Sequence, residues 1–254
     1  MPASPWHKIL DSPSDAHLVQ FYGSDESRLA ANVSIYLTEG LKNGEGALVI
    51  AIPAHLDSFQ AALNADLRKC VAWLDAQQTL DQFLRNGMPD WELFETTIPP
   101  GMQRIRAHSV GVRAYGEMVG ILWSKRRHPA AIRLEQFWNR LLSRTSFQLF
   151  CGYPIDVLNP AFDPASVDAI LCNHTHIVPA DGPEFERALC RAMEEVAGAK
   201  AEHAEALMKS ELFRARWGIL PRSEGLILWM RRHLPNHADE ILRRAKAYST
   251  AHTA

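Results

Sequence analysis

The side chains best suited to chemistry lie in and beside short apolar segments of the first 160 residues. Phe21 and Tyr22 end the first segment, His55 follows the second, and Glu117 follows a later one. If these segments are parallel strands, their carboxyl ends meet at one edge of a sheet, where α/β proteins bind ligands. Such a pocket would combine aromatic rings with a carboxylate and an imidazole, which suits a small, partly apolar ligand better than a polyphosphate. The candidate ligand-binding residues are His17, Phe21, Tyr22, His55, Arg113, Tyr115, Glu117, Cys151 and Tyr153.

Glu117 has two interpretations. It directly follows Gly116 at an expected strand end, where its carboxylate could hydrogen-bond a ligand or orient a water molecule as a general base. Alternatively, it caps the following helix or pairs with Arg113 or Arg106. His17 opens the first segment and is either a ligand contact or a structural histidine bonded to the backbone.

The turn after the first segment argues against nucleotide hydrolysis. A phosphate-binding loop needs G-x-x-x-x-G-K-[ST], because backbone N–H groups wrap the phosphates and a lysine neutralises them. Residues 23–28 read GSDESR, with no lysine and with Asp25 and Glu26 where a triphosphate would lie. These carboxylates repel phosphate and suit the positive end of a helix. We therefore expect a binding protein and not an enzyme; the alternative is a nucleotide-dependent switch or enzyme that uses Glu117.

A pair of histidines further along the chain has the spacing of metal ligands. His174, Thr175 and His176 place two imidazoles on one side of an extended segment, and Cys172 lies two residues before the first of them. The sequence shows no third ligand for such a site. We therefore expect a solvated connector here, with no metal and no cofactor.

The composition is that of an ordinary globular protein. The 254 residues are 47% hydrophobic and 22% charged, which excludes collagen-like, coiled-coil and disordered chains. The net charge of −2 gives no chain-wide positive field for nucleic acid or an anionic membrane. Because the sequence has neither a run of about 18 apolar residues nor the apolar core of a signal peptide, we expect a cytoplasmic protein. The widely spaced cysteines, without a CxxC pair, are interpreted as reduced, mostly buried thiols: Cys70, Cys151, Cys172 and Cys190.

Apolar runs that alternate with helical patterns predict the elements that position these residues. The expected strands are residues 17–22, 47–52, 70–74, 110–118 and 147–153. In 110–118 the strand is expected to run directly into a helix. The expected helices are residues 28–43, 54–65, 76–85, 91–108 with a break at Pro99, 119–125 and 130–144. Trp123 and Trp138 lie at helical spacing from apolar neighbours and are expected in the core. The fold class is α/β, with a mostly parallel central sheet flanked by helices.

The composition changes after residue 160, which predicts three parts: a domain at 1–160, a proline-containing connector at 161–182 and a helical extension at 183–254. A long helix is expected over 183–212, followed by helices at 223–233 and 236–248. The long helix carries a stripe of small and apolar residues that could join two protomers or lie against the domain: Leu189, Met193, Val196, Ala197, Ala201, Ala204 and Leu207.

The end of the chain mixes basic and apolar residues. Its arginines are Arg214, Arg216, Arg222, Arg231, Arg232, Arg243 and Arg244, and its large apolar residues include Trp217, Leu226, Ile227, Trp229, Met230 and Leu234. The apolar residues need a partner surface, so we expect them to pack on the first domain or on a second copy. The alternative is that the basic residues bind DNA.

Six strings in the first 155 residues resemble one known family. In order, they are HLVQFYGSDESRL, LTEGLKNGEGALVIAIPAH, LDAQQTL, RAYGEMVGILW, LEQFWNRL and LFCGYP. They resemble the MEDS domain, the sensory domain of methanogen and methylotroph regulators of the DcmR type. The resemblance implies a fold related to KaiC and RecA-type ATPases, here without a Walker A motif, and a sensor of small molecules such as hydrocarbon derivatives.

Together, these observations predict a cytoplasmic regulatory protein. A MEDS-type domain would sense a small molecule and relay the signal to a signalling protein partner through the C-terminal helices, either as a monomer or as a homodimer. Nucleic acid and membrane are not expected partners. A DNA-binding transcriptional regulator and a nucleotide-dependent switch with a non-standard phosphate loop are the alternatives.

Overall fold

The protein has a parallel β-sheet at its centre. The computed structural model describes residues 16–198 and 221–251, together with residues 200, 202, 204 and 206. Within this part of the chain, one sheet has six strands in the order β3-β2-β6-β7-β1-β8, and every neighbouring pair is parallel. The strands are β1 (His17–Phe21), β2 (Gly46–Ala51), β3 (Val71–Asp75), β6 (Val112–Gly116), β7 (Gln148–Tyr153) and β8 (His176–Ile177). The expected α/β fold class is therefore confirmed.

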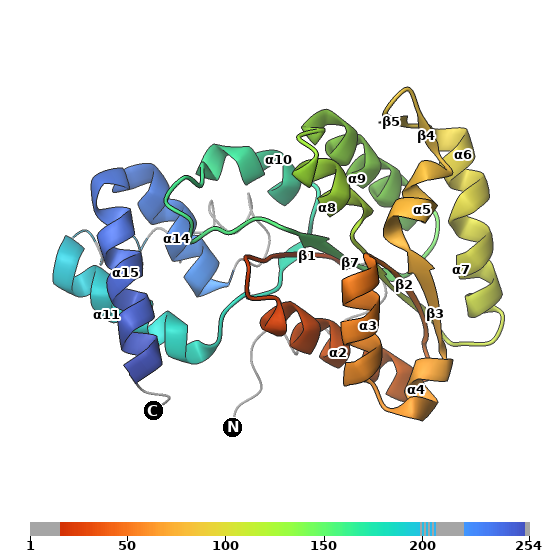
Figure 1. Ribbon diagram of the computed structural model, residues 1–254, viewed down its shortest axis with the longest axis horizontal. Helices are drawn as coiled ribbons and strands as arrows, with labels where there is room; N and C mark the ends of the chain where they lie inside the picture. Colours follow the sequence, from red (N-terminus) through yellow and green to blue (C-terminus); the bar gives the residue numbers. More distant parts are fainter. Residues whose placement is uncertain are drawn as a thin grey trace.

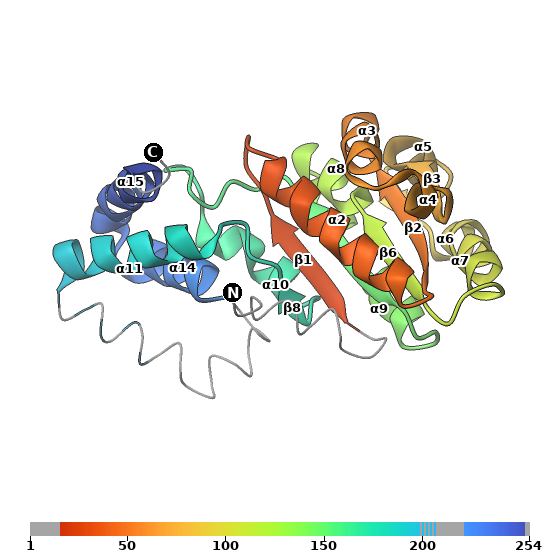
Figure 2. The ribbon, with the colours of Figure 1, turned by 90° about the horizontal axis from the view of Figure 1, so that it is seen from below.

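Helices cover both faces of the sheet (Figures 1 and 2). One face carries α2 (Ser27–Lys42), α3 (Pro53–Ala62) and α4 (Ala65–Lys69). The other carries α5 (Ala76–Asp81), α6 (Trp91–Thr97), α7 (Pro99–Arg106), α8 (Met118–Ser124) and α9 (His128–Leu142). Because successive side chains of a strand point to opposite faces, each face has its own apolar core. Leu18 of β1 packs in the core under α2, and Val19 packs in the core under α9.

The central strands are wholly buried, which explains why each of them is an apolar run in the sequence. β1, β2, β6 and β7 have no exposed residue, as expected for parallel strands that are covered on both faces. Between the expected helices 76–85 and 91–108 lies a tight hairpin of β4 (Leu84–Arg85) and β5 (Met88–Pro89). Asn86 and Gly87 both have positive φ, 50° and 79°, which is the conformation that two-residue hairpin turns require.

The connections leave the sheet toward opposite faces at two places. β2 and β6 are neighbours, but β2 leads into α3 and β6 leads into α8. Likewise, β1 leads into α2, whereas its neighbour β7 leads toward η1 (Pro164–Val167) and α10 (Asp168–Leu171) on the α9 side (Figure 1). Where neighbouring connections diverge, the carboxyl ends of the strands border a crevice. These two crevices are where a ligand site is expected.

The C-terminal helices form a separate layer beside the sheet. They are α11 (Pro183–Ala197), α14 (Arg222–His233) and α15 (Pro235–Ala251), and α11 packs along α15. The prediction of one helix over 183–212 is wrong at Gly198, which follows the end of α11 with φ +53°, a backbone conformation that glycine adopts readily. The stripe on α11, including Leu189 and Met193, is buried against the other helices. Ala201, Leu207, Arg214, Arg216 and Trp217 lie outside the described residues.

Helix α14 fastens this layer to the sheet domain. Its apolar residues Trp229 and Met230 are buried in the same core as α9. Arg231 donates to the carbonyl oxygens of Leu158 and Asn159 at 3.2 and 3.0 Å. Arg232 pairs with Asp168 of α10. The tail therefore packs on the first domain, as one of the two interpretations of its apolar residues predicted. In the described residues, no helix is long and apolar enough to cross a membrane.

Candidate functional site

Glu117 is a buried carboxylate at the carboxyl end of β6, in the crevice beside β2. Its backbone N–H donates to Ile50 O at 3.0 Å, which extends the pairing of the two strands by one residue. Its side chain is 1% exposed and accepts hydrogen bonds from Ile52 N at 2.9 Å and from the Tyr115 hydroxyl at 2.6 Å. The same carboxylate pairs with His55 Nδ1. It makes neither of the contacts that the alternative interpretation predicted, because it caps no helix through its side chain and touches neither arginine.

His55 lies between two carboxylates. It is in the first turn of α3, directly after the strand end at β2, and is 3% exposed. Its Nε2 is 2.9 Å from Glu26 Oε2, the residue before α2. Burial alone would lower the pKa of His55, but the hydrogen bond and charge of Glu117, reinforced by Glu26, raise it to about 9. His55 is therefore an imidazolium at neutral pH.

Two tyrosines complete this group, which we call the Glu117 cluster: Tyr22, Glu26, His55, Tyr115 and Glu117. The Tyr22 ring meets the His55 ring edge to face, with centroids 5.7 Å apart. Burial, and then the charges of Glu117 and Glu26, raise the pKa of Tyr22 above its usual range. Burial and Glu117 do the same to the pKa of Tyr115. Both phenols therefore stay protonated, and the Tyr115 hydroxyl donates to Glu117.

A cavity of about 400 Å³ opens on the other side of Tyr22, at the carboxyl ends of β1 and β7. The sheet domain contributes residues 20–25, 27 and 28 and residues 155–158 to its wall. The C-terminal part contributes Ala180, Asp181, Phe185 of α11, and Lys246, Ser249 and Thr250 of α15. Tyr22 is thus shared by the cavity and the Glu117 cluster, and the cavity is enclosed jointly by the sheet and the C-terminal helices.

The charges around this cavity favour some ligands over others. Three carboxylates, Asp25, Asp156 and Asp181, line it together with two cations, Arg28 and Lys246. Burial raises the pKa of Asp181, against the opposing charges of the two cations. A triphosphate would meet a net negative wall, whereas a small molecule with an apolar part and a neutral or cationic polar part would not. Of the nine residues predicted to bind a ligand, only Phe21 and Tyr22 line this cavity.

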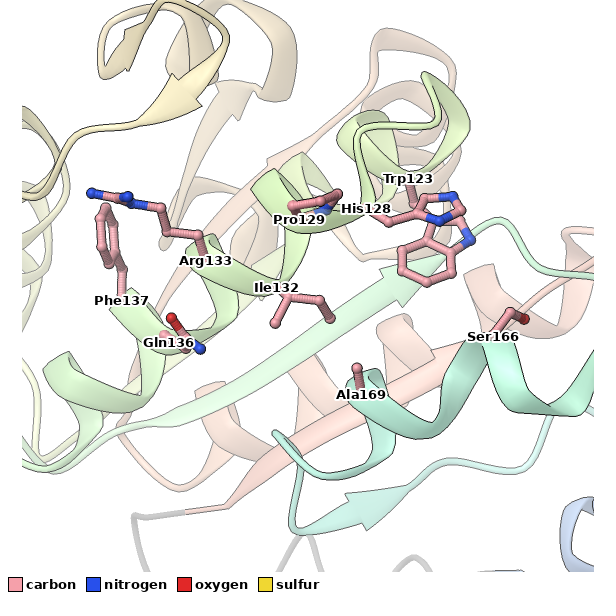
Figure 3. Close-up of a pocket in the computed structure, with 9 residues that line it drawn as sticks. All are labelled: Trp123, His128, Pro129, Ile132, Arg133, Gln136, Phe137, Ser166 and Ala169. Atoms are coloured by element: carbon pink, nitrogen blue, oxygen red, sulfur yellow. The ribbon is translucent and has the colours of Figure 1, made fainter.

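A larger cavity lies elsewhere and has a different character. It measures about 680 Å³ and runs along α9 opposite α10, lined by Trp123, His128, Pro129, Ile132, Arg133, Gln136, Phe137, Ser166 and Ala169. Figure 3 shows these side chains spread along the helices, with Arg133 and Phe137 at one end and Trp123 stacked on His128 at the other. Trp138 is buried as predicted, but Trp123 is only partly buried, because it forms this wall.

Other predicted residues lie away from the Glu117 cluster. Arg113 is buried on the α2 face, where it pairs with Glu45 at 2.5 Å and donates to Tyr36 O at 2.9 Å. Phe21 lines the cavity beside Tyr22.

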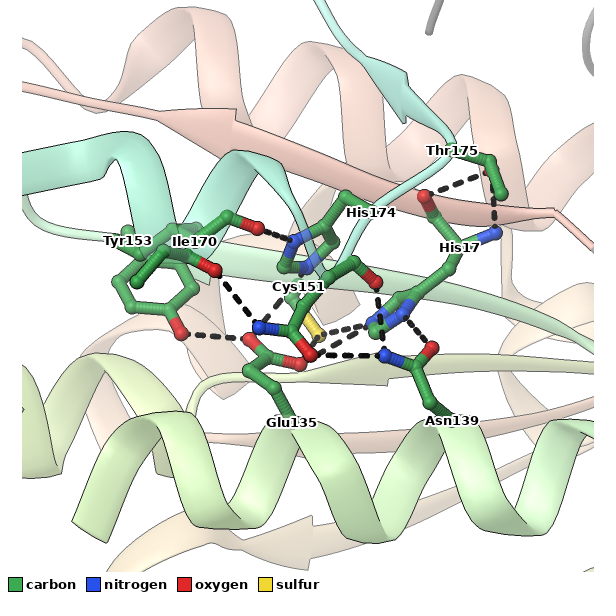
Figure 4. Close-up of polar contacts among 10 residues, drawn as sticks. His17, Glu135, Asn139, Cys151, Tyr153, Ile170, His174 and Thr175 are labelled. Carbon is green, nitrogen blue, oxygen red and sulfur yellow. Dashed lines mark hydrogen bonds and ion pairs between the residues drawn. The ribbon is translucent and has the colours of Figure 1, made fainter. Parts of the chain in front are cut away.

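The remaining three predicted residues form a second polar group, under α9 (Figure 4). His17, Cys151 and Tyr153 meet Glu135 of α9 and His174 there. The His17 side chain bonds Asn139 and not the backbone, in contrast to the structural interpretation. Four of these residues bring metal-ligating atoms within 4.8 Å of one another: His17, Glu135, Cys151 and His174.

The histidine pair and the cysteines differ from expectation. His174 points into the protein, whereas His176 is half-buried and Cys172 is exposed, so the three do not converge. The prediction that the thiols are mostly buried is wrong, since Cys70 is also exposed and only Cys151 of the four is buried. Cys70 and Cys172 lie at the ends of α4 and α10, where packing does not cover them, and Cys190 on α11 is half-buried against the core.

Several residues of both groups escaped the sequence analysis. Glu26 of the Glu117 cluster and the cavity residues Asp156, Asp181 and Lys246 carry no local pattern that would mark them as site residues. Glu135 did carry a signal, because it lies on the apolar stripe of α9 between Ala131 and Trp138. A charged residue on such a stripe is buried, and a buried charge needs a partner.

Comparison with known proteins gave one match. A model of the MEDS family, described as the MEthanogen/methylotroph, DcmR Sensory domain, matches residues 16–175. No curated protein and no solved structure matches the chain. The matched segment contains the whole Glu117 cluster and the group under α9, and it ends before the C-terminal helices.

Proposed function

Because the chain belongs to the MEDS family of sensory domains, we propose that it is a signalling protein that binds a small molecule at the carboxyl ends of β1 and β7. We further propose that the C-terminal helices pass this event to a protein partner. The observation that carries the proposal is the shared wall of the cavity. Gly23 to Asp25 belong to the sheet domain and Lys246 to α15, so one ligand would contact both parts.

The Glu117 cluster supports a binding role and not a catalytic one. A general base needs a free lone pair within reach of the substrate. The Glu117 carboxylate is almost fully buried and already accepts from Ile52, Tyr115 and His55. We propose that the cluster holds the ends of β2 and β6 and fixes the Tyr22 ring as one wall of the cavity.

The two alternatives have less support. A nucleotide switch would need phosphate to approach Asp25 and Glu26. A DNA-binding tail would need free cations, but several arginines of the tail form ion pairs within the chain. The pairs are Arg222 with Glu186, Arg231 with Asp239, Arg232 with Asp168, and Arg243 and Arg244 with Glu240.

Native mass spectrometry of the protein purified from its own host tests the binding proposal. We expect a retained small-molecule mass that disappears on denaturation. Lys246→Ala and Arg28→Ala should reduce retention, because both side chains line the cavity. Arg243→Ala is the matched control on α15, since its side chain is exposed and pairs with Glu240.

A stripped sample makes the result decisive. The protein is unfolded, refolded, incubated with a small-molecule extract of the host and measured again. Absence of a bound mass in both samples, or equal retention by the Lys246→Ala and Arg243→Ala proteins, contradicts the proposal.

A further inference from the structure

The buried polar group under α9 has the features of a metal centre. We propose that this chain binds one divalent transition-metal ion, with zinc as the best match, through four buried side chains. The ligands are His17 Nε2, a Glu135 carboxylate oxygen, Cys151 Sγ and His174 Nε2. This inference is independent of the ligand cavity, because none of the four residues lines it.

The spacing of the ligand atoms fits a tetrahedral ion. Bonds of about 2.0–2.3 Å from zinc to N, O and S place the ligand atoms of a regular tetrahedron about 3.3–3.8 Å apart. His17 Nε2 lies 3.3 Å from Glu135 Oε2 and 3.4 Å from Cys151 Sγ. His174 Nε2 lies 3.5 Å from Glu135 Oε1, and Cys151 Sγ lies 3.9 Å from Glu135 Oε2. His174 faces the second oxygen of the carboxylate, but one ligand atom from each of the four residues lies within 4.8 Å of the others, so shifts of these side chains would bring them onto one ion.

The tautomer of His174 is fixed so that its lone pair points inward. Its Nδ1 lies 2.7 Å from Ile170 O. A carbonyl oxygen only accepts, so Nδ1 carries the proton and Nε2 carries the lone pair. That Nε2 is buried and has no hydrogen-bond partner, although it faces the Glu135 carboxylate. A lone pair held against a carboxylate is unfavourable unless a cation lies between them.

His17 is held in the same way by a second residue. Its Nδ1 lies 2.9 Å from Asn139 Oδ1 (Figure 4). The Asn139 amide is oriented by its own donor group, Nδ2, which reaches Asn173 O at 3.0 Å and Asn173 Oδ1 at 3.1 Å. Its oxygen therefore faces His17 and accepts from Nδ1, which leaves the Nε2 lone pair for a metal. Outer hydrogen bonds of this kind orient histidine ligands in metal proteins.

The charges balance when an ion is bound. The Cys151 thiol loses its proton on binding, and the thiolate and the Glu135 carboxylate together neutralise a dication. Neutrality matters because the Glu135 and His17 side chains are at most 1% exposed, and an unpaired charge at such a site is costly. The Tyr153 hydroxyl donates to Glu135 Oε1 at 2.6 Å and fixes the carboxylate.

The ligand set points to zinc and to a structural site. Thiolate and imidazole ligands suit zinc, and four protein ligands leave no open position for a substrate. His17 belongs to the first strand of the family segment and His174 to its last residues, 157 positions later. The ion would fasten β1 and β7 to α9 and to the segment that leads toward the C-terminal helices.

Cobalt(II) and zinc are the probes that test the site. The full chain is unfolded, stripped with a chelator, and refolded with cobalt(II) or zinc. We expect about one ion per chain, the strong visible bands of tetrahedral cobalt, and a thiolate-to-cobalt charge-transfer band. Zinc should displace the cobalt and raise the melting temperature of the refolded protein.

Variants assign the ligands. The triple variant Cys70→Ser, Cys172→Ser, Cys190→Ser leaves Cys151 as the sole thiol and should keep the charge-transfer band. His174→Gln should weaken zinc binding by more than about 100-fold, and Asn139→Ala by about 10- to 100-fold, the usual cost of losing an outer hydrogen bond. His176→Gln is the matched control, because its ring is half-buried and lies outside the group.

The outcomes separate the proposal from a metal-free hydrogen-bonded cluster. Failure of the wild-type chain to bind either ion, or a six-coordinate cobalt spectrum without thiolate, overturns it. So does loss of the charge-transfer band in the triple variant. If His174→Gln does not fold, the wild-type and triple-variant spectra still decide, because both proteins keep all four proposed ligands.

Discussion

Replacing Glu117 by glutamine should remove a specific pH-dependent part of the stability. The carboxylate, with Glu26, raises the pKa of His55 from 6.5 to about 9. Each pKa unit between the unfolded and folded states is worth about 1.4 kcal/mol, so the protonated imidazole contributes at most about 3 kcal/mol. Glutamine keeps the shape and can still accept from Ile52 and Tyr115, but it carries no charge. Because Glu26 stays, we expect Glu117→Gln to lose about 2 kcal/mol near neutral pH.

The direction of the His55 pKa shift sets the pH range over which the histidine stabilises the folded protein. His55 has a raised pKa in the folded state, so its contribution is fully present below pH 6.5. It is lost as the pH rises through about 9, where the folded histidine releases its proton. The difference between wild type and Glu117→Gln should therefore be largest at about pH 6 and shrink toward about pH 10.

The free energy of unfolding of both proteins is measured by urea denaturation across this pH range, and the titration of His55 is followed by NMR. Glu184→Gln is the control, since its carboxylate is half-exposed and pairs only with Arg187 along the helix. Its effect should stay within about 0.5 kcal/mol at every pH. A wild-type His55 that titrates near pH 6.5, or a difference between the two proteins that does not change with pH, would refute the reasoning.

Three further predictions follow from buried and exposed side chains. Burial raises the pKa of Glu224 to about 7 from 4.5, so the stability that its protonated form provides is present below pH 4.5 and lost as the pH rises through about 7. As the pH rises from about 5 to 8, Glu224→Gln should therefore gain stability relative to wild type, by at most about 3 kcal/mol, in urea denaturation. A difference in unfolding free energy that does not change with pH would contradict this. Trp138→Ala should cost about 3–5 kcal/mol, because the indole is almost fully buried under α9; a loss below about 1 kcal/mol in the same assay would contradict its place in the core. Cys70 and Cys172 should react rapidly with a thiol reagent in the native protein, and Cys151 only after unfolding; fast reaction of Cys151 would contradict its burial.

The sequence predicted the elements well because the central strands are buried on both faces. All five predicted strands occur, and their ends differ by one or two residues, for example 46–51 in place of 47–52 for β2. β8 was not predicted because it has only two residues, His176 and Ile177, and no periodicity can mark so short a strand. It adds a sixth strand within the segment predicted as a connector, at the edge beside β1.

The candidate residues were predictable from the sequence, but their groupings were not. His55 and Glu117 each followed an expected strand end, yet their contact depends on β2 lying beside β6, an order that no local pattern encodes. The same limit applies to His17 and Tyr22, which lie at the two ends of the expected strand 17–22 and were both predicted to bind the ligand. Since neighbouring side chains of a strand face opposite cores, His17 lies under α9, and Tyr22 lies on the α2 side.

Hydrogen–deuterium exchange tests most directly whether one bound molecule couples the sheet domain to the C-terminal helices. The protein carrying its retained ligand is compared with the stripped protein, and amide exchange is followed by mass spectrometry. The account predicts slower exchange on binding in residues 23–28 and in α15, because both line the same cavity. Protection confined to the sheet domain, or centred on the groove along α9, would contradict it.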